Sequence, residues 1–167
     1  MIAPAFDQNH QAAMNLSDLI SLDAIIPASH AQNKKAVLLE LADKAAELTA
    51  LDARLIFEAL QTRERLGSTS VGRGIAVPHG RIAGLEHITC AFARLAEPIA
   101  FGDTAEQAVD LVFLLLTPEH AGADHLKALS RLSRLLREPQ TIEKLRGARD
   151  RKALFAIMSD PVASHAA

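Results

Sequence analysis

The sequence has a single cysteine and no long apolar segment. These two features argue against a disulfide-stabilised protein and against a membrane-spanning one. Cys90 is the only cysteine among 167 residues, so no disulfide can form within the chain and we expect a reduced, cytoplasmic setting. Because Cys90 lies in an alternating apolar stretch, we expect a buried, unreactive thiol. The longest strongly apolar run, residues 111–116, is far shorter than the roughly 20 residues that a membrane-spanning helix needs. We therefore predict no membrane insertion.

The sequence also lacks an excess of positive charge. Its 18 Lys and Arg residues against 20 Asp and Glu residues give a net charge of −2, which provides no general attraction to nucleic acid. Hydrophobic residues make up 49% and charged residues 23%, as in an ordinary globular protein. At this length we expect a single domain over residues 16–160, with a flexible N-terminal tail at 1–15 and a frayed C-terminal tail at 161–167.

The spacing of apolar residues predicts several helices. Apolar residues recur at helical spacing after Asn33 and again after Asp52, and each of these polar residues is a plausible N-cap. Further helices are expected over residues 124–137, 141–146 and 150–159. The apolar side of the first of these would be formed by Leu126, Leu129, Leu132 and Leu136. Pro139 should end that helix.

Strands are expected between these helices. The predicted strands are residues 24–28, 74–77, 89–95 and 109–116. The last of them is almost continuously apolar, as in a central strand covered on both faces. Pro98 and residues 102–107 mark the connection before it. Together the elements predict an α/β fold, in which helices flank a small mixed β-sheet as a three-layer α/β/α sandwich.

Residues 63–81 contain the histidine that we expect to carry chemistry. They read Arg-Glu-Arg-Leu-Gly-Ser-Thr-Ser-Val-Gly-Arg-Gly-Ile-Ala-Val-Pro-His-Gly-Arg and place His79 between Pro78 and Gly80. Pro78 fixes its own φ and keeps the residue before it extended. Gly80 would let the backbone turn sharply and leave space above the imidazole. This context presents a histidine instead of burying it.

The loop before His79 contains the groups that bind anions. Ser68 and Thr69 supply hydroxyls, and the glycines around them allow free backbone N–H groups to approach an oxyanion. Fixed positive charge comes from Arg63, Arg65, Arg73 and Arg81. An exposed imidazole beside an oxyanion site indicates phosphoryl chemistry on histidine. The alternative that Ser68 and Thr69 are only turn residues stays open.

This run resembles the phosphorylation-site region of the IIA proteins of the bacterial phosphoenolpyruvate-dependent phosphotransferase system, fructose/mannitol type, and is most similar to the nitrogen-regulatory branch. The resemblance rests on Thr-Arg-Glu, Leu-Gly-Ser-Thr and Gly-x-Gly-Ile-Ala-Val-Pro-His-Gly, in this order. It implies that His79 accepts a phosphoryl group from a small histidine phosphocarrier protein. It also implies that Arg63 is the active-site arginine, and we expect Ser68, Thr69 and Gly80 to bind phosphate.

Residues 118–126 resemble the second active-site segment of the same family, in which a His-Leu pair follows a short loop. By that resemblance His125 is the partner histidine, and His120 is not. The residues themselves place His125 in the first turn of a helix, where the helix dipole disfavours a protonated imidazole. A neutral His125 would offer an N–H to a phosphoryl oxygen. His120 and His125 could form part of a metal site, but no further ligands occur at suitable spacing, so we expect no metal and no cofactor.

The resemblance implies a phosphohistidine carrier that regulates partner proteins, such as potassium-transport components or sensor kinases, by its phosphorylation state. Two alternatives stay open. One is a sugar-specific fructose/mannitol IIA that passes phosphate to a IIB domain. The other is a regulatory binding module without chemistry.

Overall fold

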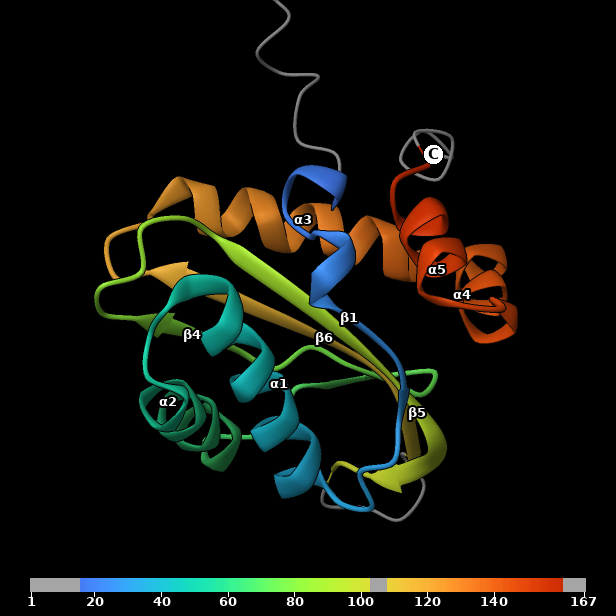
Figure 1. The fold of residues 1–167 in the computed structure, drawn as a ribbon, viewed down its shortest axis with the longest axis horizontal. Coiled ribbons are helices and arrows are strands. Elements are labelled where there is room, and N and C mark those ends of the chain that lie inside the picture. Colours follow the sequence, from blue (N-terminus) through green and yellow to red (C-terminus); the bar gives the residue numbers. More distant parts are fainter. Residues whose placement is uncertain (1–15, 103–107, 161–167) are drawn as a thin grey trace, which may run out of the picture.

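The computed structural model describes residues 16–102 and 108–160. A six-stranded mixed sheet forms the middle layer, and helices cover both of its faces (Figure 1). Helices α1 and α2 lie on one face, and α3, α4 and α5 lie on the other (Figure 1). This arrangement confirms the predicted α/β sandwich. The tails predicted at 1–15 and 161–167, and the connection at 103–107, lie outside the described residues.

The sheet is built around its most buried strand. The strands are β1 (Ile25–Ser29), β2 (Ser70–Gly72), β3 (Ile75–Ala76), β4 (His79–Ile82), β5 (Thr89–Ala100) and β6 (Ala108–Pro118). Their order is β1-β5-β6-β3-β2, and β4 pairs with β6 beyond the end of β3. Strand β6 runs antiparallel to β5 and parallel to both β3 and β4. The apolar run of β6 is buried, as predicted for a central strand.

The helices begin and end close to the predicted positions. They are α1 (Lys34–Thr49), α2 (Ala53–Arg65), α3 (Ala123–Arg137), α4 (Pro139–Gly147) and α5 (Arg151–Met158). Both predicted caps are present: the Asn33 side chain accepts from the N–H of Ala36 at 2.8 Å, and the Asp52 side chain accepts from the N–H of Arg54 at 2.9 Å. Two 3₁₀ turns, Leu16–Asp18 and Leu22–Ala24, precede β1.

Proline positions account for two differences from the prediction. Strand β5 continues through Pro98 to Ala100, although Pro98 was expected to mark a connection. The pairing of β5 with β6 shifts register between Arg94 and Ile99, and such an irregularity accommodates a residue that has no N–H to donate. Pro139 follows the end of α3, but it also begins α4, because a helix leaves the first N–H groups unpaired in any case.

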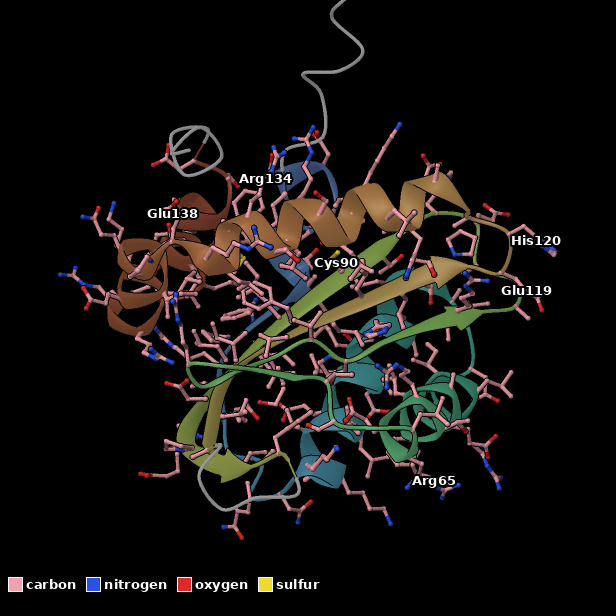
Figure 2. All side chains as sticks on the ribbon, turned by 180° about the vertical axis from the view of Figure 1, so that it is seen from behind. Arg65, Cys90, Glu119, His120, Arg134 and Glu138 are labelled. Atoms are coloured by element: carbon pink, nitrogen blue, oxygen red, sulfur yellow. The ribbon has the colours of Figure 1, made fainter. Side chains whose placement is uncertain are left out.

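Side-chain burial agrees with most of the predicted core. Cys90 is buried in β5 beneath α3 (Figure 2), and burial raises the pKa of its thiol to about 12. Leu132 and Leu136 are buried on the inner side of α3, but Leu126 is 68% exposed and does not belong to the core. Leu126 lies in the first turn of α3, next to His125. In the part of the chain that the structure describes, no helix is long and apolar enough to cross a membrane.

Candidate functional site

His79 is the first residue of β4, where it pairs with Leu115 of β6. The preceding carbonyl, that of Pro78, accepts the N–H of Leu115 at 3.0 Å, so β6 fixes the backbone on both sides of the imidazole. The sharp turn expected at Gly80 is wrong, because Gly80 continues β4 opposite Leu116. A side chain at this position would also fit, because a Cβ on Gly80 would lie 3.8 Å from the Cβ of Ala59 on α2, an ordinary van der Waals contact.

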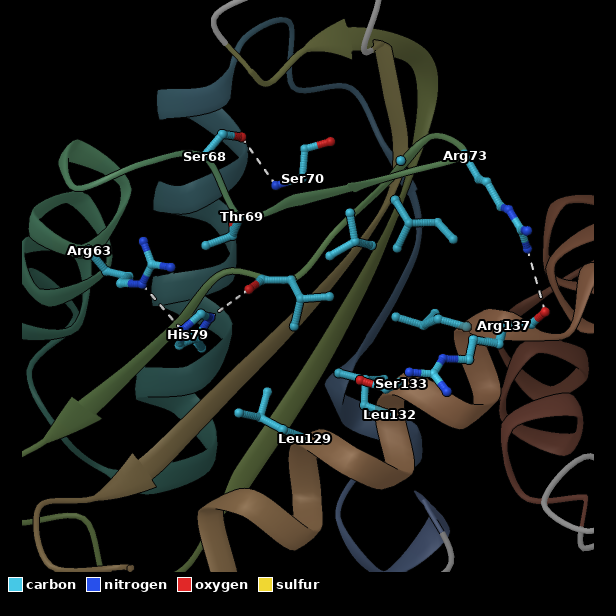
Figure 3. A pocket seen from close by; sticks show the side chains of 15 residues that line it. Arg63, Ser68, Thr69, Ser70, Arg73, His79, Leu129, Leu132, Ser133 and Arg137 are labelled. Atoms are coloured by element: carbon cyan, nitrogen blue, oxygen red, sulfur yellow. Dashed lines mark hydrogen bonds between the residues drawn. The ribbon is translucent and has the colours of Figure 1, made fainter.

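Two hydrogen bonds fix the imidazole of His79 (Figure 3). Its Nδ1 lies 2.9 Å from the carbonyl oxygen of Val77, and its Nε2 lies 3.3 Å from Nε of Arg63. Because a carbonyl only accepts, Nδ1 carries the ring proton and donates it to Val77. Because a guanidinium only donates, Nε2 must present its lone pair to Arg63. The ring nitrogen that presents a lone pair toward the site is therefore Nε2.

Arg63 reaches the imidazole from the last turn of α2. Its side chain points toward the loop that follows the helix (Figure 3). Its Nη1 donates to the carbonyl oxygen of Gly67 at 3.0 Å while its Nε donates to His79. The guanidinium is therefore held in one orientation beside Nε2, where it supplies fixed positive charge.

The next residue on α2, Glu64, belongs to the same site and was not identified from the sequence as a site residue. Its carboxylate is 5% exposed and forms an ion pair with Nζ of Lys34 at 2.6 Å. It also accepts the backbone N–H of Thr69 at 3.2 Å and the Thr69 hydroxyl hydrogen. The sequence does contain a signal for Glu64, which is a charged residue at a position where the helical spacing expects an apolar one. Glu64 follows the buried Ile56 and Leu60 at intervals of four residues, so it lies on the inner stripe of α2, the side that faces the core. A carboxylate at such a position indicates a specific role.

The hydroxyls of Ser68 and Thr69, which were predicted to bind phosphate, lie beside the site, but both already form hydrogen bonds within the protein. The donors of Thr69, its N–H and its hydroxyl, are both taken by Glu64. The Ser68 hydroxyl contacts the carbonyl oxygen of Phe101 at 3.3 Å and accepts the N–H of Ser70 at 3.1 Å. Phosphate binding by Ser68, Thr69 and Gly80 therefore stays a prediction, and Thr69 has no donor left over in this arrangement.

His125 lies opposite His79, in the first turn of α3. The centroids of the two rings are 6.3 Å apart, with 50° between the ring planes. Nδ1 of His125 is buried without a hydrogen-bond partner among the residues that the structure describes. Burial, then the charges of His79 and Arg81, lower the pKa of His125. The predicted direction agrees, but the main cause is burial and not the helix dipole.

Two hollows meet at His79. One, of about 790 Å³, extends from Arg63 and His79 between the β2–β3 segment and α3 (Figure 3). The other, of about 640 Å³, lies between α2 and His125, and Arg63 and His79 line it as well. Two exposed leucines line the second hollow: Leu55 is 59% and Leu66 is 82% exposed. An open surface on which exposed leucines lie beside an imidazole is typical of a site where another macromolecule docks.

His120 does not take part in this arrangement. It is exposed in the loop between β6 and α3, beside Glu119 (Figure 2). Within residues 16–102 and 108–160, no three His, Cys, Asp or Glu side chains are grouped so that they could hold a metal ion.

Comparison with known proteins gives the same picture over almost the whole chain. Residues 18–160 match the family model described as "Phosphoenolpyruvate-dependent sugar phosphotransferase system, EIIA 2". A nitrogen regulatory protein of Bradyrhizobium diazoefficiens is 52% identical over 153 residues, which are 92% of this chain and 100% of that protein.

Solved structures agree with these matches. The crystal structure of nitrogen regulatory protein IIA-Ntr from Neisseria meningitidis has a TM-score of 0.79 and 34% identity, and the match covers 86% of this chain and 98% of that one. Mannitol enzyme IIA of Escherichia coli, solved in a complex with phosphorylated mannitol enzyme IIB, has a TM-score of 0.72. At 19% identity, over 84% of this chain and 98% of the other, that likeness shows the fold alone. The chain therefore belongs to the EIIA 2 family of the phosphoenolpyruvate-dependent sugar phosphotransferase system.

Proposed function

We propose that this chain is a phosphohistidine carrier of the nitrogen-related phosphotransferase system. His79 accepts a phosphoryl group from a histidine phosphocarrier protein, and the phosphorylation state of His79 then regulates partner proteins. The observation that carries the proposal is the lone pair of His79 Nε2, which is oriented by the Val77 carbonyl and lies 3.3 Å from Nε of Arg63. An imidazole that already presents a lone pair needs no general base before it attacks phosphorus.

The transfer step conserves protons. The Nε2 lone pair of His79 forms the new N–P bond, and the donor nitrogen leaves with the electron pair of the old N–P bond. Each imidazole keeps the proton on its other nitrogen. Because the proton on Nδ1 of His79 stays bonded to the Val77 carbonyl at 2.9 Å, that carbonyl also stabilises the positive charge that the ring gains on phosphorylation.

Arg63 and His125 stabilise the phosphoryl oxygens from two sides. When phosphorus occupies the Nε2 position, the Nε–H of Arg63 loses its acceptor there and turns to an equatorial oxygen. His125, 6.3 Å from His79 between ring centroids, is close enough for its ring to reach an oxygen placed between the two rings. Its lowered pKa keeps it neutral, so it contributes one hydrogen bond. Ser68 and Gly80 line the approach, while Thr69 supports the loop.

The exposed leucines around His79 provide the docking surface for the donor. Leu55 on α2 and Leu66 directly after it line the hollow at His79, so they form an apolar rim beside the imidazole. A phosphorylated His79 would place roughly two negative charges inside that rim. Such a change weakens binding to any partner that covers the rim with apolar or acidic groups. This is the physical basis for regulating target proteins, such as potassium-transport components or sensor kinases, in the cytoplasm.

The test is the intact mass of the chain after incubation with phosphoenolpyruvate, enzyme I and the histidine phosphocarrier protein. We expect one acid-labile phosphoryl group on the wild type and on His87→Ala, which alters an exposed histidine, and none on His79→Ala. No mass increase with a competent donor, or an unchanged increase in His79→Ala, would overturn the carrier proposal and leave a binding module without chemistry.

A sugar-specific role is the second candidate, because the Escherichia coli mannitol enzyme IIA with this fold was solved in complex with its phosphorylated enzyme IIB. It predicts that the phosphorylated chain passes its phosphoryl group to a fructose- or mannitol-type IIB domain. Incubating the phosphorylated chain with such a domain separates the two roles. Loss of phosphate from His79 with gain by the IIB domain supports the sugar-specific role, whereas retention supports the regulatory one.

A further inference from the structure

We infer that Glu64 is a positioning residue that sets the orientation and tautomer of His79 through Thr69 and Val77. The inference rests on the proposed function of His79 and extends it to a residue that does not touch the phosphoryl group. Glu64 sits on the inner stripe of α2, where Ile56 and Leu60 precede it, and its carboxylate is 5% exposed.

The contacts form a continuous path from Glu64 to the imidazole. Glu64 accepts both donors of Thr69, the N–H at 3.2 Å and the hydroxyl hydrogen. The carbonyl oxygen of Thr69 accepts the N–H of Val77 at 3.0 Å. The carbonyl oxygen of Val77 in turn accepts Nδ1–H of His79 at 2.9 Å. Each link fixes the group that makes the next one, so the position of Thr69 determines where the Val77 carbonyl points.

The same turn of α2 holds the other side of the imidazole. Arg63 donates to the carbonyl oxygen of Gly67 at 3.0 Å and to Nε2 of His79 at 3.3 Å. Arg63 and Glu64 therefore hydrogen-bond to the loop at 67–69 from adjacent positions on one helix. As a result, the loop links two features of the site. One is the His79 tautomer that leaves the Nε2 lone pair free, and the other is the position of the Arg63 guanidinium beside that nitrogen.

Lys34 explains how a carboxylate can be tolerated so close to a phosphoryl site. A buried charge is strongly unfavourable unless it is paired and hydrogen-bonded, and an unpaired carboxylate would repel the phosphoryl group. Nζ of Lys34 lies 2.6 Å from Oε2 of Glu64 and 4.7 Å from the ring centroid of Phe101. Lys34 thus neutralises Glu64, and together Lys34 and Thr69 give both carboxylate oxygens a partner. An apolar residue would complete the stripe of α2 more simply, but it could not hold Thr69.

Three variants and one control test the inference. Glu64→Ala removes the acceptor of Thr69. Thr69→Val keeps the shape and the backbone but removes the hydroxyl, and Thr69→Ser restores the hydroxyl. The matched control is Glu47→Ala on α1, which removes a carboxylate that is 69% exposed and paired with Lys44 at 3.2 Å. Circular dichroism and thermal melting establish that each variant is folded.

The first readout is the tautomer of His79, measured from the imidazole ¹⁵N shifts of unphosphorylated protein at alkaline pH. The wild type and Glu47→Ala should hold the proton on Nδ1. Glu64→Ala should shift it toward Nε2, the form that free imidazole prefers in water, and Thr69→Val should do so in part. Thr69→Ser should retain more of the Nδ1–H form than Thr69→Val does.

The second readout is the rate of phosphoryl acceptance at different concentrations of phosphorylated donor. A misaligned acceptor in Glu64→Ala should lower the maximal rate about 10- to 100-fold. The donor concentration at half-maximal rate should change less than about twofold, because the leucine rim is untouched.

A folded Glu64→Ala with wild-type tautomer and rate would overturn the inference. If Glu64→Ala does not fold, Thr69→Val decides: a shifted tautomer supports the inference, and an unchanged one overturns it. A wild type that accepts no phosphoryl group would refute the proposed function instead, and the ¹⁵N measurement would still decide whether Glu64 positions the ring.

Discussion

The two histidines that face each other across the site are held in opposite ways. Both ring nitrogens of His79 are engaged, Nδ1 by a carbonyl at 2.9 Å and Nε2 by Arg63 at 3.3 Å. Nδ1 of His125 is buried without a partner among the described residues. His79 is thus fixed before any donor arrives, whereas His125 has hydrogen-bonding capacity that the resting site does not use.

The difference follows from the elements that supply each residue. His79 begins a strand that is paired with β6, and the loop before it is fastened to α2 by Glu64. His125 lies in the first turn of a helix whose N-cap is Gly122, a residue with no side chain to cap it, at φ 50°. In the proposed transfer His79 is the nucleophile and must keep one geometry, because the in-line approach to phosphorus tolerates little misalignment. A group that only stabilises the phosphoryl oxygens can settle once they are in place.

Removing the positive charge next to His79 should cause the largest loss in the rate of phosphoryl acceptance. Arg63→Gln leaves Nε2 without its cationic partner and removes charge stabilisation from the transferring group. We expect the rate of phosphoryl acceptance to fall about 10²- to 10³-fold, as when one preorganised oxyanion donor is lost. Rapid-quench measurement with phosphorylated donor gives this rate.

The control for Arg63→Gln is Arg65→Gln, which removes an equal charge from an exposed position two residues later on the same helix. Arg65→Gln should stay within about twofold of the wild type, since screened surface charge contributes little. Equal losses in the two variants would show that Arg63 acts only through general attraction of the donor.

A smaller effect is expected on the other side of the site. His125→Ala removes one neutral hydrogen bond to the phosphoryl group, which corresponds to a loss of about tenfold in rate. His125→Asn offers a side-chain N–H from the same helix position and should recover part of that loss. His120→Ala, which changes an exposed histidine in the adjoining loop, should have no effect. A loss in His125→Ala as large as that in Arg63→Gln would mean that His125 acts as a cation.

The sequence predicts the regular parts of this fold well because the determining signals are local. Side-chain caps at Asn33 and Asp52 and helical spacing of leucines fix α1 and α2, and a continuous apolar run identifies β6. The missed strands β2 and β4 have no such signal. Residues His79–Ile82 include a glycine and only one buried apolar residue, Ile82, so their extended form comes from pairing with β6 and not from their own pattern.

The same limit applies to the site. His79, Arg63 and His125 could be selected from the sequence because their side chains and motifs are visible there. The acceptor for Nδ1 could not, because it is the main-chain carbonyl of Val77 and any residue type supplies one. Glu64 was visible as a charge on a buried stripe. Its link to Thr69 depends on how the loop at 67–69 folds back onto α2, which spacing along the chain does not reveal.

The smallest predicted effect is on the pH dependence of the free energy of unfolding. It concerns His125, whose pKa is lowered in the folded chain. Burial and the neighbouring His79 and Arg81 lower the pKa of His125 in the folded chain. When the pH falls through the ordinary range of an imidazole, the unfolded chain therefore takes up a proton at this position before the folded chain does. Protonation then favours unfolding, so the free energy of unfolding decreases toward acid pH.

Urea unfolding on both sides of that range, at about pH 7.5 and about pH 5.5, measures the decrease. It should be smaller in His125→Gln, which cannot titrate, than in the wild type, and unchanged in the control His87→Gln. Phosphorylation of His79 should reverse the sign at His125, since roughly two negative charges next to the ring raise its pKa. A ring whose proton resonances titrate alike in phosphorylated and unphosphorylated protein would show that His125 does not face the phosphoryl group.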